Sequence, residues 1–63
     1  MDNNIYNLML QITQDQKSIW RMKKYYINDA GSCQECKDFW SRFITQKEEN
    51  VRIMQDLVKK HLK

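Results

Sequence analysis

The sequence predicts an all-α fold, an antiparallel hairpin of two long helices that dimerises into a four-helix bundle. The 63 residues include no proline and a single glycine, Gly31, near the middle of the chain, which is typical of helices with one break. Apolar residues recur at helical spacing on both sides of Gly31. A chain this short buries only about 60% of its unfolded surface, so one hairpin is expected to need a partner for stability.

The first helix is expected to span about residues 3–28. Asp2 or Asn3 can cap its start, because their side-chain oxygens can accept the free amides of the first turn. One face of this helix collects apolar residues: Ile5, Leu8, Met9, Ile12, Ile19, Met22 and Tyr26. The helix is expected to end before a turn at residues 29–32, where Gly31 tolerates the left-handed conformation that terminates helices.

The second helix is expected to span about residues 33–62. Ser32 and Glu35 match the Ser-x-x-Glu capping box, in which each side chain binds the backbone amide of the other residue. The apolar face consists of Cys36, Phe39, Trp40, Phe43, Ile44, Val51, Met54, Leu57, Val58 and Leu62. A linker of a few residues forces the two helices antiparallel, so residues 1–63 are expected to form one domain.

Both helices carry more apolar residues than one hairpin can bury. The surplus residues beside the two stripes are Tyr6, Leu10, Trp20, Ile27 and Ile53. Such a surplus usually marks an interface, and two hairpins related by two-fold symmetry are the simplest closed assembly. Six aromatic residues lie toward the turn and are expected to build the main core there: Trp20, Tyr25, Tyr26, Phe39, Trp40 and Phe43.

Polar residues interrupt both apolar stripes at mid-length. They are Gln11 and Asp15 on the first helix, and Lys47 and Asn50 on the second. Folding the chain at its turn brings Asp15 within one helical turn of Lys47, which predicts a buried ion pair. We expect the four residues to form a polar layer that fixes helix register and oligomeric state at some cost in stability.

The carboxylate of Asp15, followed by Lys-Glu-Glu-Asn-Val-Arg-Ile-Met at residues 47–54, resembles half of a ferritin-like or rubrerythrin-like bundle. Those families place a Glu on one helix and a Glu-x-x-His on the next to bind two irons. In this alignment Lys47 replaces the second Glu and Asn50 replaces the His. The resemblance implies a two-helix half-bundle. A residual metal site would use Asp15 and Glu48, although the cation at Lys47 opposes a bound metal ion.

Cys33 and Cys36 form a Cys-x-x-Cys pair at the first turn of the second helix, where the helix dipole favours the thiolate form. A zinc site needs four ligands, whereas one chain supplies these two thiols and the distant His61. Zinc would therefore require ligands from two chains. A thiol-redox pair is the second possibility. The third has Cys36 packed as a small apolar residue and Cys33 exposed at the cap.

Lys17, Arg21 and Lys24 recur at positions i, i+4 and i+7 on the outer side of the first helix. A basic stripe of this kind can follow a phosphate backbone. The arrangement is similar in architecture, though not in sequence motif, to the Rop family of plasmid copy-control proteins, whose helical-hairpin dimers bind paired RNA loops. A solvated surface is the alternative, because three charges give weak and salt-sensitive binding.

The composition narrows the function classes. The net charge is +3, which is below the dense basic clustering of a dedicated nucleic-acid-binding protein. The longest apolar run is residues 8–10, so neither a membrane span nor a signal peptide is expected. No set of nucleophile, acid and base can be assembled. We therefore expect a cytoplasmic, non-enzymatic interaction or accessory module that self-associates and docks on a partner. A nucleic-acid-binding dimer and a metal or thiol module remain the alternatives.

Overall fold

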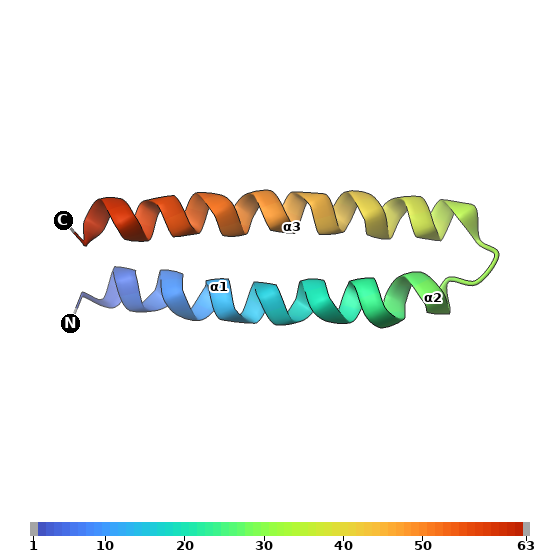
Figure 1. Cartoon of the computed structure of the whole chain (residues 1–63), viewed down its shortest axis with the longest axis horizontal. Coiled ribbons are helices and arrows are strands. Elements are labelled where there is room, and N and C mark those ends of the chain that lie inside the picture. Colours follow the sequence, from blue (N-terminus) through green and yellow to red (C-terminus); the bar gives the residue numbers. More distant parts are fainter. Residues whose placement is uncertain (1, 63) are drawn as a thin grey trace.

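The computed structural model describes residues 2–62 and forms a hairpin of two antiparallel helical arms (Figure 1). The arms lie side by side, and Asp2 and Leu62 lie at the end opposite the turn. The molecule is elongated, with extents of 48 × 14 × 12 Å. The predicted all-α hairpin is confirmed, and its dimerisation stays a prediction.

The first arm consists of α1 (Asn3–Arg21), a π-helical turn η1 (Met22–Tyr26) and α2 (Ile27–Asp29). The Oδ1 atom of Asp2 accepts a hydrogen bond from the backbone N–H of Asn4 at 2.8 Å, and this caps α1. The three segments run on without a break, and the arm ends one residue beyond the predicted position.

The second arm is the single helix α3 (Gln34–His61). Cys33 is its N-cap, because its Sγ atom accepts a hydrogen bond from the backbone N–H of Cys36 at 3.3 Å. The predicted capping box of Ser32 and Glu35 is therefore wrong. A hydrogen bond from the N–H of Cys33 to the carbonyl oxygen of Ala30 holds Ser32 inside the turn, so the helix begins after Cys33.

The turn between the arms depends on Gly31. Its φ of 59° lies in the left-handed region, which residues with a Cβ atom rarely adopt. The backbone N–H of Gly31 donates to the carbonyl oxygen of Asn28 at 3.1 Å and closes the end of the first arm. The turn thus forms at the glycine that the sequence singled out.

The π turn changes which side chains face α3. The N–H of Ile27 donates to the carbonyl oxygen of Met22, so this turn holds one residue more than an α-helical turn. In a continuous α-helix, side chains five residues apart point about 140° apart. With the wide turn, Met22 is buried and Ile27 is half-buried at the contact between the arms. The predicted inner position of Tyr26 is wrong, because this residue is 40% exposed.

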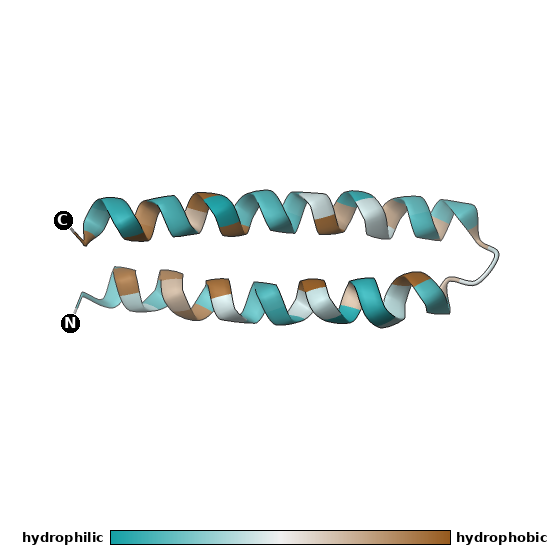
Figure 2. Cartoon of the chain, in the orientation of Figure 1, coloured by the Kyte–Doolittle hydropathy of each residue, from teal (hydrophilic) through white to brown (hydrophobic). Residues whose placement is uncertain are grey.

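The core is narrow. Figure 2 shows hydrophobic residues recurring along the facing sides of the arms. Among residues 2–62, the buried hydrophobic residues are Met22, Ile44 and Val51. The side of α3 that faces the first arm alternates spacings of three and four residues, as in a coiled coil. This side consists of Lys37, Trp40, Ile44, Lys47, Val51, Met54 and Val58.

None of the helices within residues 2–62 combines the length and the apolar character needed to cross a membrane.

Deleting Lys24 tests the role of the π turn. The deletion shortens this turn by one residue, so Met22 and the present Ile27 become four residues apart and still share a face. We expect the thermal unfolding midpoint (Tm) and the free energy of unfolding in urea to change little. Circular dichroism measures both. Deleting Lys17 from regular α1 is the matched control. It rotates the following residues by about 100° and is expected to cost about 2–5 kcal/mol through lost burial of Met22. Equal losses for both deletions would contradict this role.

Candidate interaction surface

Large apolar side chains lie mostly on the outside of the hairpin. Within residues 2–62, eleven of them are 38–66% exposed. They are Tyr6, Met9, Leu10, Trp20, Tyr25, Tyr26, Phe39, Phe43, Ile53, Leu57 and Leu62. Only three hydrophobic residues are buried in the same part of the chain. The single hairpin therefore leaves many large apolar side chains partly exposed to water.

Four rings form an aromatic cluster near the turn, consisting of Tyr26, Phe39, Trp40 and Phe43. Trp40 lies at the centre, with its ring centroid 5.0 Å from that of Tyr26, 5.1 Å from that of Phe39 and 5.9 Å from that of Phe43, in each case edge to face. Tyr26, Phe39 and Phe43 are nevertheless 40–49% exposed. Within the single hairpin, the prediction that the aromatic residues build the main core is wrong for Tyr26, Phe39 and Phe43, because two helices enclose only the strip between them.

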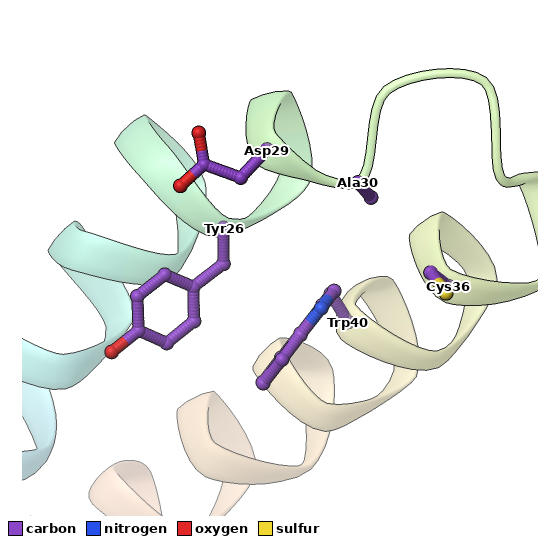
Figure 3. A pocket seen from close by; sticks show the side chains of 5 residues that line it. All are labelled: Tyr26, Asp29, Ala30, Cys36 and Trp40. Atoms are coloured by element: carbon purple, nitrogen blue, oxygen red, sulfur yellow. The ribbon is translucent and has the colours of Figure 1, made fainter.

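The aromatic cluster borders a hollow between the ends of the arms (Figure 3). Its walls are Tyr26 and Asp29 from the first arm, Ala30 from the turn, and Cys36 and Trp40 from α3. The side chains of Ala30 and Cys36 are small and leave space next to the indole of Trp40 (Figure 3). The aromatic cluster thus continues into an open recess.

A polar group lies beside the aromatic cluster, at mid-length of the arms. Oδ1 of Asp15 accepts hydrogen bonds from Nζ of Lys47 at 3.0 Å and from Nε2 of Gln11 at 2.9 Å. The Asp15 side chain is 8% exposed and that of Lys47 is 25% exposed. Nζ of Lys47 also lies 5.6 Å from the ring centroid of Phe43. Asn50 is not part of this group. It is exposed and accepts a hydrogen bond from Gln46 at 3.1 Å.

The two thiols lie together at the start of α3. The Sγ atoms of Cys33 and Cys36 are 2.8 Å apart, and both cysteines are free and exposed. The hydrogen bond between the two thiols, assisted by the backbone N–H of Cys36, lowers the pKa of Cys33. The same thiol–thiol bond raises the pKa of Cys36. Cys33 therefore forms the thiolate more readily than Cys36. Cys36 lines the recess and is not buried as a small core residue.

The predicted metal ligands are not assembled within one chain. Residues 2–62 contain no group of three or more His, Cys, Asp or Glu side chains that could hold a metal ion. Asp15 is bonded to Lys47, and Glu48 accepts a hydrogen bond from Lys23 of the other arm at 3.0 Å. Each of these carboxylates already has a cationic partner, so binding a metal there would require that partner to be displaced.

The predicted basic stripe is divided. Lys17 and Arg21 line a shallow groove on the outside of α1. Nζ of Lys24, in the π turn, instead lies 4.8 Å from the ring centroid of Trp20 and 5.7 Å from that of Tyr25. The wide turn changes the direction of the residues that follow Met22. Two cations remain in line for a phosphate backbone, and the third is engaged by aromatic rings.

The side-chain contacts that were not predicted from the sequence include two that involve Glu48 and Asn50. One is the ion pair between Lys23 and Glu48, whose side chains are 55% and 49% exposed. Long exposed side chains pair without leaving a periodic signal, and such pairs contribute little to stability. The other is the bond between Gln46 and Asn50, whose spacing of four residues on a helix was the available signal.

Comparisons of the chain with protein-family models, characterised proteins and solved structures found no match.

Replacing Lys47 by Ala tests the ion pair between the arms. The change leaves a buried carboxylate without its cation, so we expect the free energy of unfolding in urea to fall by about 2 kcal/mol at fixed protein concentration. Lys23→Ala removes the exposed pair between the same arms and should cost less than about 1 kcal/mol. The double variant Asp15→Leu/Lys47→Met should recover the loss, since apolar replacement of both partners is often neutral or stabilising. A double variant less stable than Lys47→Ala would contradict this account.

Alkylation with iodoacetamide tests the difference between the thiols. Because the pKa of Cys33 is lowered and that of Cys36 is raised, Cys33 should react faster at pH 7. Cys36→Ala removes the thiol that is hydrogen-bonded to Cys33, so the pKa of Cys33 should rise and its rate at pH 7 should fall. Above pH 10, where Cys33 is a thiolate in either protein, the two rates should converge. Peptide mass mapping measures each site separately. Equal rates for the two cysteines at pH 7 would contradict the assignment.

Proposed function

We propose that the chain is a small cytoplasmic interaction module that acts by self-association of its hairpins and by docking on a partner, not by catalysis. The exposed apolar surface carries this proposal. The chain has an accessible surface of 5032 Å² for a mass of 7.8 kDa, whereas a compact monomer of that mass exposes about 4400 Å². The excess of about 600 Å² reflects the elongated shape of a single hairpin, and the eleven exposed large apolar side chains lie on this surface.

The chemistry of the surface supports the same function. Aromatic residues are enriched in the buried centres of interfaces, because they bury large areas and lose little conformational entropy. In the aromatic cluster, edge-to-face packing around Trp40 already fixes the ring positions. A partner would therefore meet a pre-ordered surface, with the polar group of Asp15 and Lys47 at its border.

A second candidate is a thiol-redox module based on Cys33 and Cys36. The 2.8 Å separation of two exposed Sγ atoms and the opposite shifts of their pKa values support it. Such a pair would present one nucleophilic and one resolving thiol. It would operate beside the aromatic cluster, since Cys36 and Trp40 line the same recess.

Sedimentation equilibrium under reducing conditions tests self-association. We expect a dimer whose thermal unfolding midpoint rises with protein concentration. Phe43→Glu places a charge on the exposed aromatic cluster and should weaken the dimer at least about 30-fold, the effect of losing a 2 kcal/mol contact. Thr45→Glu is the matched control. Thr45 is also exposed, but it lies two residues after Phe43 on α3, so its side chain points away from the aromatic cluster. A monomer at all concentrations, or equal effects of the two substitutions, would contradict the proposal.

A further inference from the structure

A second line of exposed side chains runs along α3, beside the side that faces the first arm. We call this line the outer strip, and it consists of Phe39, Phe43, Gln46, Asn50, Ile53 and Leu57. All six residues are exposed, and the four apolar ones are 49%, 40%, 44% and 38% exposed in chain order. Their spacings alternate between four and three residues, so they follow one seam along a coiled-coil helix. The outer strip is therefore a complete helix-pairing surface without a partner in the single chain.

The outer strip shows the same order of side-chain types when it is followed from either end. This order is two apolar residues, two amides and two apolar residues. Phe39 and Leu57 lie equally far from residue 48, as do Phe43 and Ile53, and also Gln46 and Asn50. If a second copy is rotated about a two-fold axis at the level of residue 48, the aromatic rings of each copy face the aliphatic side chains of the other. The amides of the two copies then face each other.

We propose that two copies of the chain pair through their outer strips, with the α3 helices antiparallel and the two-fold axis at the level of residue 48. This inference rests on the proposed function and specifies its partner and geometry. It places the two turns at opposite ends of the assembly. Each aromatic cluster then packs against the aliphatic half of the other α3.

The central amides set the register. In the single hairpin, Nε2 of Gln46 donates to Oδ1 of Asn50. Each amide keeps further donors and acceptors, so Gln46 and Asn50 of one copy can bond to Asn50 and Gln46 of the other. A shift of one heptad would place these amides against Phe39 and Phe43, or against Ile53 and Leu57, and leave them without a polar partner in the other copy. Polar residues at the centre of a helical seam fix register in this way.

The charges beside the outer strip favour the antiparallel orientation. Arg42 and Asp56 flank opposite halves of the strip, so the two-fold axis brings Arg42 of one copy within one turn of Asp56 of the other. A parallel pair would leave Arg42 of one copy about 21 Å along the helix axis from Asp56 of the other, so this attraction would be absent. Glu49 lies close to the axis. Arg52 is bonded to Glu49 at 2.5 Å and to Asp56 at 3.5 Å, so it offsets part of the charge of each carboxylate.

Disulfide cross-linking tests this geometry and leaves the outer strip intact. Cys36 and Lys60 extend the strip at its two ends and lie equally far from residue 48. In the variant Cys33→Ser/Lys60→Cys, the two cysteines of one chain are about 36 Å apart along α3 and cannot join. Mild oxidation with oxidised glutathione, followed by peptide mass mapping, should give a dimer linked from Cys36 to the cysteine introduced at position 60.

The control is Cys33→Ser/Lys59→Cys, because position 59 points about 100° away from position 60. We expect at least about ten-fold less cross-linking in this control. Links between two Cys36 residues, or between two introduced cysteines, would show parallel pairing and overturn the inference. Sedimentation of the reduced variant separates the two proposals. A dimer that yields no link from Cys36 to position 60 overturns only the geometry, whereas a monomer overturns self-association as well.

Discussion

Two helices share only one line of contact, and this constraint governs the rest of the structure. Each arm can bury a strip about one side chain wide, so the core is limited to residues such as Met22, Ile44 and Val51. Apolar side chains that lie beside this strip must face outward, whatever their size. The aromatic cluster and the outer strip are exposed for this reason. The same constraint makes a second layer of helices the natural way to complete the fold.

The ion pair of Asp15 and Lys47 occupies positions in this narrow core that apolar residues could fill. Apolar residues there would remove more hydrocarbon from water and avoid the desolvation of two charges. The bond from Lys47 to Asp15, however, crosses between the arms and requires one alignment, whereas Gln11 lies on the same helix as Asp15 and bonds to it in any alignment. The pair therefore selects one alignment of the arms among several that apolar contacts alone would permit.

The sequence predicted the hairpin, its turn and the approach of Asp15 to Lys47, because each depends on a local or periodic signal. Gly31 marks the turn, and two helical stripes mark the arms. Periodicity predicts the direction in which a side chain points but not how much protein covers it. The exposure of Phe39 and Phe43 could therefore not be predicted from the sequence. The π turn did not follow either. It depends on the gain from burying both Met22 and Ile27, which is set by α3 and not by the local residues.

The position of the aromatic cluster next to the turn bears on the order in which contacts can form. Tyr26 and Trp40 are 14 residues apart in the chain, whereas Asp15 and Lys47 are 32 residues apart. Closing the shorter loop costs about 0.7 kcal/mol less chain entropy. The largest rings thus meet where the entropic penalty is smallest, and each later contact extends a segment that is already closed. The two arms can therefore pair progressively from the turn toward the open end of the hairpin. Such local contacts favour rapid folding.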